Sequence, residues 1–508
     1  MNDEKNEITK TSDARCASGV EGLDEILGEG LPSDCFYLLQ GDPGSGKTTL
    51  ALQFLLEGVR RGEKTLYITL SETKAELLKV ARSHGWSLDA IPLFELSAIE
   101  SLVHPDARST VFHSSELELT KVTDLLLEAT RKTKPTRIVF DSLSEFRLMA
   151  ETALRYRRQL LNLKQEFAKY QSTVLLLDDK MDNNRIGSDP HVFSLTHGVI
   201  EMEQLSPDYG RSRRRLRILK LRGVRFCEGY HDYTIETGGV RVFPRIVAAE
   251  HRTELRHEPV SSGQTDLDDL LGGGLDRGTT TLIMGPAGTG KSTIGIQYAV
   301  QLAQQGEPSM LFAFDEIRSI ILSRAAALGL DVAKHVKSGT IDIQQMDPAE
   351  VSPGEFGMRI RRGVEAGCKM IIIDSLNGYL NAMPGEKYLT NQLHEFSAYL
   401  NQQGVVTIFM LAQHGLLGPS ESPVDLSYLA DTVVHVRYFE AGGMVRQALS
   451  VIKKRSGHHE KTIREFTLES GRGLRIGSPL KQFQGILSGA PRFYGATEQM
   501  MERSDAGQ

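Results

Sequence analysis

Two short segments combine glycines, a lysine and hydroxyl side chains in an order that binds the phosphates of a nucleotide. Each follows the pattern of a glycine, four further residues, Gly-Lys and then Ser or Thr. The glycines let backbone N–H groups surround a phosphate chain, and the helix that follows points its positive N-terminal end at the same anion. The predicted nucleotide-binding residues are Gly41, Asp42, Pro43, Gly44, Ser45, Gly46, Lys47, Thr48 and Thr49, and Gly285, Pro286, Ala287, Gly288, Thr289, Gly290, Lys291, Ser292 and Thr293.

The surroundings of both loops fit this interpretation. An apolar segment precedes each loop and an apolar-periodic helical pattern follows it. Lys47 and Lys291 would contact the terminal phosphates, and the hydroxyl groups of Thr48 and Ser292 would bind Mg²⁺. We therefore expect ATP and Mg²⁺ as cofactors.

Two aspartates are further candidate ligands of the metal. Asp141 and Asp374 each end an apolar segment and precede Ser-Leu. Open parallel sheets bind their ligands at the carboxyl ends of the strands, where such a carboxylate could hold Mg²⁺. A strand-end aspartate also commonly forms a turn or caps a helix, but its recurrence at the matching place after both loops favours the metal role.

Acidic residues also follow the second apolar segment after each loop. Glu72 and Glu316 stand there, and each could orient or deprotonate an attacking water or hydroxyl group. Asp315 gives Glu316 a neighbouring carboxylate, whereas Ser71 precedes Glu72. The alternative is an acid that a helix N-terminus favours electrostatically, and this alternative is stronger for Glu72.

Four cations end later strands at matching positions. Lys220 and Arg222 in the first half correspond to Lys453 and Arg455 in the second. Side chains there cannot easily contact the phosphates of their own domain and would be well placed to contact those of a neighbouring subunit, as an arginine finger does. The alternative is a solvated charge that protects the edge of a sheet from aggregation.

An internal repeat divides the chain. Gly22–Leu31 recurs as Asp266–Leu275, and the two loop lysines lie 244 positions apart. The two strand-end aspartates lie 233 positions apart, so two homologous domains differ by one change of length. We expect a flexible N-terminus at 1–17, nucleotide-binding domains at 18–247 and 262–494, a charged linker at 248–261 and a flexible tail at 495–508.

Short apolar segments alternate with helical patterns in each domain, which predicts an α/β fold with a mostly parallel sheet flanked by helices. The expected strands are 36–39, 65–70, 138–140 and 173–177 in the first domain and 281–284, 310–314, 370–373 and 405–411 in the second. Two later segments, 216–220 and 449–453, are expected to add antiparallel strands at the sheet edge.

The composition is that of a globular protein. The chain has 508 residues and a net charge of −6, which argues against a protein that coats nucleic acid. The N-terminal residues lack an apolar targeting segment and no later run is long enough to span a membrane, so we expect a soluble cytoplasmic protein. The four cysteines form no metal-binding spacing.

Taken together, these motifs resemble the KaiC family, the double-domain RecA-type ATPases and autokinases of the cyanobacterial circadian clock. Lys220-Leu221-Arg222-Gly223 and Ile463-Arg464-Glu465-Phe466 also fit, and the similarity extends from about Ser18 to about Tyr494. The resemblance implies two tandem RecA-like domains, a homohexamer with ATP between subunits, hydrolysis in the N-terminal ring and autophosphorylation in the C-terminal ring. It indicates a homologue rather than the clock protein itself.

The family's functional residues transfer with differences. Its pair of glutamates falls on Ser71-Glu72 and on Asp315-Glu316, so the first domain lacks the leading carboxylate. The Ser-Thr pair that the family phosphorylates falls on Ser427 and Tyr428. Because tyrosine places its hydroxyl further from the backbone, we expect phosphorylation at a single site, Ser427.

Other interpretations remain open at this point. Phe483–Pro491 resembles the loop through which a clock partner regulates the kinase, which suggests a KaiB-like or other signalling partner. The chain could instead be a DNA-directed ATPase of the RecA or helicase type, although no basic segment with interleaved aromatic residues supports this. A third possibility is a scaffold that binds ATP only to assemble, which Ser71 makes most plausible for the N-terminal domain.

Overall fold

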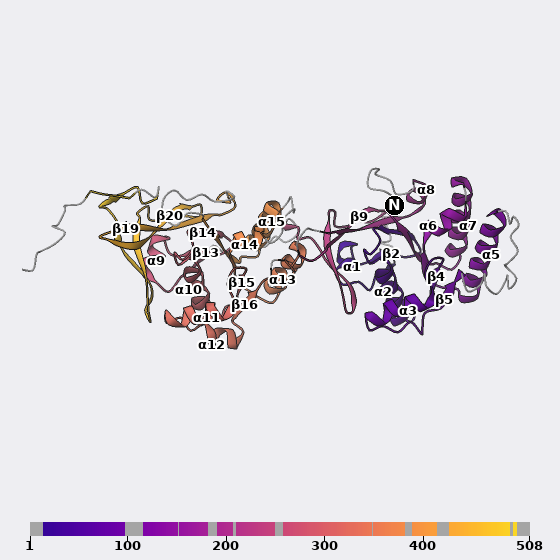
Figure 1. Ribbon diagram of the computed structural model, residues 1–508, viewed down its shortest axis with the longest axis horizontal. Coiled ribbons are helices and arrows are strands. Elements are labelled where there is room, and N and C mark those ends of the chain that lie inside the picture. The colour runs from indigo at the N-terminus through magenta and orange to yellow at the C-terminus, as the bar shows by residue number, and fades with distance from the viewer. Residues whose placement is uncertain are drawn as a thin grey trace, which may run out of the picture. The chain divides into compact units, whose positions relative to one another are not determined.

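The chain folds into two compact units, Met1–Arg245 and Ile246–Gln508, here called the N-terminal and the C-terminal unit (Figure 1). The computed structural model describes residues 14–96, 115–150, 152–180, 190–206, 210–248, 258–347, 349–381, 389–413, 426–487 and 491–494. Both units are of the α/β class with helices on a mostly parallel sheet, so the predicted fold class is confirmed.

A nine-stranded sheet forms the centre of the N-terminal unit. In order across the sheet, its strands are β11 (Gly239–Phe243), β10 (His231–Glu236), β9 (Arg213–Leu221), β8 (Gly198–Leu205), β3 (Phe36–Gly41), β7 (Thr173–Asp179), β6 (Arg137–Asp141), β4 (Thr65–Thr69) and β5 (Leu93–Glu95). The pairings from β8 to β5 are parallel. The strands β9, β10 and β11 add antiparallel pairings at one side.

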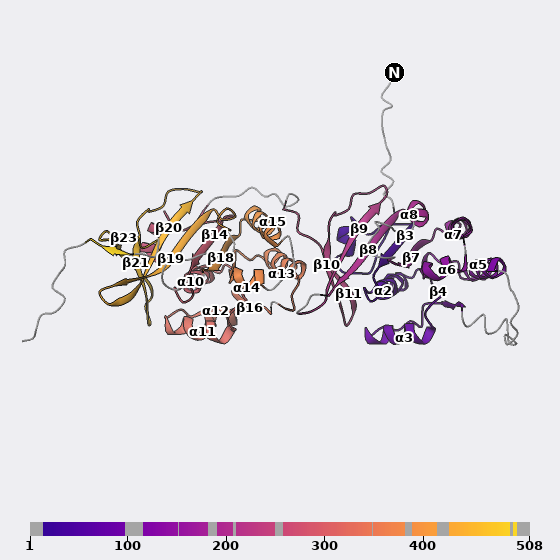
Figure 2. The ribbon, with the colours of Figure 1, turned by 45° about the horizontal axis from the view of Figure 1, so that its top comes forward.

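Helices cover both faces of this sheet (Figure 2). They are α1 (Leu23–Ile26), α2 (Lys47–Arg60), α3 (Lys74–Ser83), α5 (Ser115–Thr133), α6 (Leu143–Met149), α7 (Ala153–Ala168) and α8 (Pro190–Leu195). Side chains alternate along β3 as a strand buried on both faces requires. Tyr37 and Leu39 join the core that includes α2 and α3, whereas Phe36 and Leu38 join the core that includes α5, α6 and α7.

The sheet of the C-terminal unit repeats this topology. Its strands, in order, are β16 (Ile341–Gln345), β15 (Ser309–Ala313), β17 (Met370–Asp374), β18 (Val406–Ala412), β14 (Thr280–Gly285), β19 (Thr432–Ala441), β20 (Met444–Lys454), β21 (Arg464–Glu469) and β22 (Gly473–Pro479). The pairings from β16 to β19 are parallel, and those from β19 to β22 are antiparallel.

The helices of the C-terminal unit follow the same plan. They are α9 (Thr265–Leu270), α10 (Lys291–Gln304), α11 (Arg318–Ala327), α12 (Val332–Ser338), α13 (Pro353–Glu365), α14 (Leu376–Asn381) and α15 (Leu389–Gln402). A short hairpin of β23 (Phe483–Gln484) and β24 (Arg492–Phe493) follows the main sheet. Within the described parts of both units, no helix has the length and apolar character needed to cross a bilayer.

Two segments expected to be flexible or to serve as a linker are partly ordered. The pairs are β1 (Arg15–Cys16) with β2 (Leu31–Pro32), and β12 (Pro259–Val260) with β13 (Leu275–Asp276). The end of the expected N-terminus, 1–17, and the end of the expected linker, 248–261, therefore belong to the folded units. The physical reason is that Cys16 and Val260 are buried in the apolar cores of their units. The expected tail, 495–508, lies outside the described residues.

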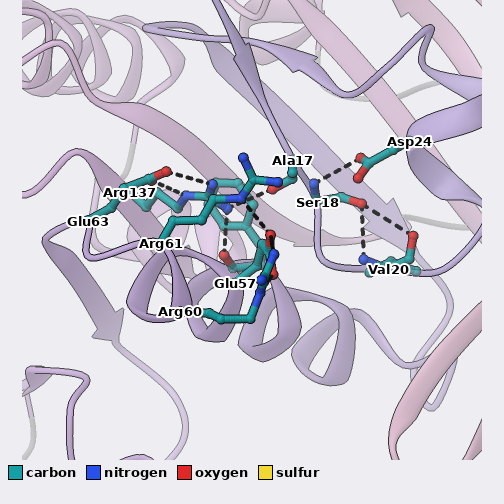
Figure 3. Close-up of polar contacts among 10 residues, drawn as sticks. Ala17, Ser18, Val20, Asp24, Glu57, Arg60, Arg61, Glu63 and Arg137 are labelled. Carbon is teal, nitrogen blue, oxygen red and sulfur yellow. Dashed lines mark hydrogen bonds and ion pairs between the residues drawn. The ribbon is translucent and has the colours of Figure 1, made fainter.

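A buried arginine connects three parts of the N-terminal unit (Figure 3). The Nη1 atom of Arg137 donates to the backbone oxygens of Ala17 and Phe54, at 2.7 and 2.9 Å. Its Nε and Nη2 atoms face the carboxylate of Glu63. Gly58 makes room for this side chain, because a Cβ atom there would lie 2.7 Å from Cδ of Arg137.

Candidate nucleotide sites

The first candidate loop joins β3 to α2, and its glycines have a structural reason. Gly44 and Gly46 have φ values of 79° and 94°, which favour glycine. A Cβ atom on Gly41 would lie 2.3 Å from the backbone oxygen of Met202. Since α2 begins at Lys47, its free backbone N–H groups lie at the end of the loop, where they could bind an anion.

The lysine of this loop is held by oxygen atoms. Lys47 Nζ donates to the backbone oxygens of Gly41 and Asp42, each 3.0 Å away. It also forms an ion pair of 2.9 Å with Asp179 at the end of β7. A bound phosphate would therefore compete with a carboxylate for this ammonium group.

Three predicted site residues lie together beside the loop. Thr48 Oγ1 contacts Glu72 Oε1 at 3.5 Å, and Asp141 Oδ2 accepts a hydrogen bond of 2.6 Å from Tyr67. Burial, and then the charge of Asp141, raises the pKa of Glu72 to about 7. Burial also raises the pKa of Asp141, although the Tyr67 hydroxyl and the charge of Lys47 oppose this effect. The site thus concentrates negative charge that a cation would relieve.

The second candidate loop joins β14 to α10 with the same backbone. Gly288 and Gly290 have φ values of 79° and 91°. A Cβ atom on Gly285 would lie 2.0 Å from the backbone oxygen of Val436. Lys291 is the first residue of α10, as Lys47 is of α2.

The second loop lysine has different neighbours. Lys291 Nζ donates to two loop carbonyl oxygens at 2.9 and 2.7 Å. Ala412 occupies the strand position that Asp179 has in the other unit, opposite the last residue of the loop strand. Burial lowers the pKa of Lys291 to about 8, and the charges of Asp374 and Asp315 oppose this effect.

The predicted metal ligands of the C-terminal unit also lie together. Burial raises the pKa of Asp374, while a hydrogen bond with Ser292 opposes this effect. Leu311 stands at the position of Tyr67 in the sheet, so no equivalent hydroxyl binds this aspartate. Asp315 accepts a hydrogen bond from Ser375, the residue that follows Asp374.

The candidate catalytic glutamate of this unit forms an ion pair. Glu316 Oε1 lies 2.5 Å from Nη1 of Arg324, which belongs to α11. The matching residue on α3 of the N-terminal unit is Val80, and Glu72 contacts a loop hydroxyl instead.

The four predicted cations contact the segments that precede β8 and β19. Lys220 Nζ donates to the backbone oxygens of Phe193, in α8, and of Thr196, whereas Lys453 Nζ donates to those of Ser427 and Ala430 in the turn before β19. Arg222 and Arg455 each donate to a further backbone oxygen of these segments at 3.3 Å. These contacts hold both segments, and a role toward a neighbouring subunit stays a prediction.

The predicted phosphoacceptor lies in the turn before β19. Ser427 is partly buried and Tyr428 is 52% exposed. Asp431 ends this turn and accepts a hydrogen bond of 3.0 Å from the backbone N–H of Thr280, the first residue of β14. The candidate loop follows the other end of β14. Ser427 and Lys291 of one chain therefore lie toward opposite ends of this strand.

A comparison with protein families decides the relationship. A family model described as "ATPase: KaiC" matches residues 16–246 and 260–481. The chain belongs to the KaiC family. The matched segments contain both candidate loops, so the resemblance predicted from the sequence is confirmed. The chain is thus a KaiC-like ATPase with two nucleotide-binding units.

Individual KaiC proteins are similar over nearly their whole length. The circadian clock oscillator protein KaiC of Picosynechococcus sp. is 27% identical over 487 residues, which cover 93% of this chain and 91% of the relative. The same protein of Thermosynechococcus vestitus is 28% identical over 488 residues, with 93% and 90% covered. The circadian clock protein KaiC3 of Synechocystis sp. is 27% identical over 493 residues, with 95% of each chain covered.

Three residues of these KaiC-type sites were missed by sequence reasoning. Asp179 could have been found, because it ends an apolar strand as Asp141 does. Tyr67 gave no signal, because a tyrosine in a buried strand is ordinary core composition. Arg324 also gave none, since its contact with a residue eight positions earlier depends on how α11 packs.

Proposed function

We propose that this KaiC-family chain is a Mg²⁺-dependent ATPase whose C-terminal unit also phosphorylates Ser427, and that it works as a homohexameric signalling switch. One observation carries the proposal. In each unit three groups lie near one another at the carboxyl ends of the parallel strands, as the contacts of Thr48 and Ser292 indicate. They are the loop hydroxyl, the aspartate that ends one strand and the glutamate that follows the neighbouring strand. This is the arrangement that phosphoryl transfer requires.

The residues present fit Mg²⁺ and ATP. Glu72 Oε2 and Glu316 Oε2 are buried and have no hydrogen-bond partner among the described residues, so each could accept a bond from water at a bound metal or phosphate. The glycine loops leave room for backbone N–H groups to surround phosphates. When bound, Mg²⁺ would neutralise charge on the phosphate oxygens. Thr48 with Asp141, and Ser292 with Asp374, would hold it.

Glu316 is proposed to accept the proton from the attacking group. In hydrolysis that group is water, and in autophosphorylation it is the hydroxyl of Ser427. The hydroxyl oxygen forms the new bond to phosphorus as the bond to the departing ADP oxygen breaks. Asp315 accepts a hydrogen bond from Ser375 and would thereby hold the backbone that follows Asp374 in place.

The position of Ser427 supports transfer between subunits. The strand β14 has six residues, so roughly 17 Å separates its start, near Ser427, from its loop. Transfer would then need the loop of a neighbouring chain, and Lys453 and Arg455 lie at the same edge as Ser427. A ring of subunits would bring these groups to the neighbour's ATP.

A partner could act through the segment at the end of the fold. Phe483 packs against Phe439 of β19, with ring centroids 5.5 Å apart. The backbone oxygen of Leu487 accepts a hydrogen bond of 2.6 Å from Arg437, also on β19. Since β19 pairs with the loop strand, a KaiB-like or other cytoplasmic signalling protein that displaced this segment would change the site.

The test combines assembly with phosphate mapping. We expect the wild-type chain with Mg-ATP to form a hexamer and to carry phosphate on Ser427, and Lys291→Ala and Ser427→Ala to remove that phosphate. Tyr428→Phe is the matched control and should keep it. An assembled, ATP-bound sample without phosphate on Ser427 would refute the kinase activity, and a chain that stays monomeric with ATP would refute the ring.

A second function is favoured for the N-terminal unit alone. In this unit Lys47 forms an ion pair with Asp179, and Asp141 accepts a hydrogen bond from Tyr67. The same unit has Ser71 in place of a carboxylate. These contacts favour a unit that binds ATP mainly to assemble. If so, Lys47→Ala would abolish assembly while Glu72→Gln would leave total turnover nearly unchanged.

A further inference from the structure

One arginine of the C-terminal site has unused hydrogen-bond donors. Arg324 uses Nη1 to contact Glu316, whereas its Nε and Nη2 atoms are buried with no hydrogen-bond partner among the described residues. Burying guanidinium N–H groups without an acceptor is costly. An acceptor that arrives when the site is filled would satisfy these two donors.

The position of Arg324 identifies the acceptor. Glu316 follows β15, and Asp374 ends the neighbouring strand β17, so both lie at the carboxyl edge beside the loop. The charges of Arg324 and Lys291 both oppose the burial that raises the pKa of Asp374. The guanidinium group of Arg324 thus lies in the electrostatic surroundings of the metal ligand and the loop lysine, where the terminal phosphate of ATP would bind.

Guanidinium groups suit this ligand. Their planar N–H donors match the oxygens of a phosphate, and such charge-assisted hydrogen bonds are among the strongest in proteins. The N-terminal unit has no arginine at this position, because Val80 occupies it. The feature therefore distinguishes the two sites of one chain.

We propose that Arg324 binds the terminal phosphate of ATP within its own subunit and, through Nη1, holds Glu316 beside it. This proposal rests on the proposed nucleotide site of the C-terminal unit and adds a residue that recognises the third phosphate. The site would consequently prefer ATP over ADP more strongly than the N-terminal site does. Replacing Val80 with arginine would be the way to transfer that preference.

The experiment compares nucleotides that differ by one phosphate. Binding of ADP and of a non-hydrolysable ATP analogue with an imido bridge is measured by calorimetry on the full-length chain and again with Lys47→Ala. We expect Arg324→Gln to weaken the analogue by roughly ten- to a hundredfold and ADP by less than about threefold. Arg324→Lys should restore part of the loss. Arg318→Gln removes an exposed charge from the same helix and should change neither affinity.

The outcomes separate this inference from the function on which it rests. Unchanged binding of both nucleotides by Arg324→Gln, or an equal loss for both, would overturn the role at the terminal phosphate. Lys291→Ala tests the site itself, and unchanged binding by that variant would overturn both proposals. Melting curves of each variant show whether a loss comes from unfolding. If Arg324→Gln fails to fold, Arg324→Lys and Val80→Arg carry the comparison.

Discussion

The two units place the same loop on the same sheet, yet different side chains surround it. In the N-terminal unit Lys47 contacts the carboxylate of Asp179, and Tyr67 donates to Asp141. In the C-terminal unit Ala412 and Leu311 occupy those positions, and the charged partner is instead Arg324 on the glutamate. After duplication, the backbone that binds phosphate was kept while the electrostatic surroundings diverged.

This difference shows why a loop motif alone does not give an activity. A phosphate that binds Lys47 must displace Asp179, although this carboxylate is about half exposed and its attraction is screened by water. Among the described residues, no carboxylate forms an ion pair with Lys291, and this side chain is buried. The C-terminal site is therefore expected to be the more active one.

The largest expected effect tests this ranking. Glu316→Gln should lower steady-state phosphate release by roughly 10²- to 10⁴-fold at the C-terminal site, because an amide cannot accept the proton. Glu72→Gln should remove only the smaller contribution of the N-terminal site. Phosphate release by the two full-length variants and the double variant is the measurement. A larger loss for Glu72→Gln would reverse the ranking.

The second effect concerns stability and uses a difference inside the cores. The N-terminal unit buries Arg137 beside Gly58, whereas Met370 and Leu302 stand at the matching positions and are fully buried. Arg137→Met should destabilise by about 3–5 kcal/mol, since Glu63 and two backbone oxygens lose their donor. Gly58→Leu should cost about 1–3 kcal/mol by overpacking. The double variant should lose less than the sum of the two single variants, because leucine fills space that the guanidinium group leaves, although Glu63 and the two backbone oxygens stay without their donor.

The chain offers a selective reporter for this cycle. Its single tryptophan, Trp86, lies in the N-terminal unit, so its fluorescence during denaturation follows that unit. Leu302→Ala, in the other unit, is the matched control and should leave this transition unchanged. Additive losses in the double variant would contradict the idea that the two pairs are alternative solutions to the same packing problem.

The sequence was informative wherever the decisive pattern is local. Loops, apolar strands and the aspartates that end β6 and β17 follow from neighbouring residues, and the structure has them there. The sequence did not predict that Cys16 and Val260 belong to the folded cores, because their burial depends on pairing with strands more than ten residues away. The contacts of Arg324 and Asp179 likewise depend on tertiary packing, so the difference between the two sites stayed hidden.

A third, smaller effect depends on pH. His231 accepts from the backbone N–H of Arg245 at Nδ1 and contacts the oxygen of Cys227 through Nε2, which requires a neutral ring. Burial lowers the pKa of His231 to about 4. The unfolded chain binds the proton below about pH 6.5, so stability that is present above this pH is lost as pH falls toward 4, by up to about 3 kcal/mol.

The comparison of units isolates this histidine. His231→Gln should make the stability of the N-terminal unit, followed by Trp86 fluorescence, fall less steeply between pH 6.5 and 4.5. His435 in the C-terminal unit is also buried, with a pKa lowered to about 4, but on a non-equivalent strand. His435→Gln should therefore leave the Trp86 profile unchanged. An unchanged slope for His231→Gln would assign the acid sensitivity to other groups.

The smallest effect concerns the helices that follow the two glutamates. Thr73 caps α3 and exchanges hydrogen bonds with Glu76, whereas Ile317 and Ile320 stand at the matching positions of α11, where no side chain caps the helix. Ile317→Thr with Ile320→Glu should stabilise α11 by about 1 kcal/mol, measured as slower hydrogen exchange of its amides. Both isoleucines are about half exposed in the single chain, so their replacement should cost little. A loss of stability that appears only in the assembled protein would mean that a neighbouring subunit covers these isoleucines. The missing cap of α11 would then reflect a subunit contact that the C-terminal unit makes and the N-terminal unit does not.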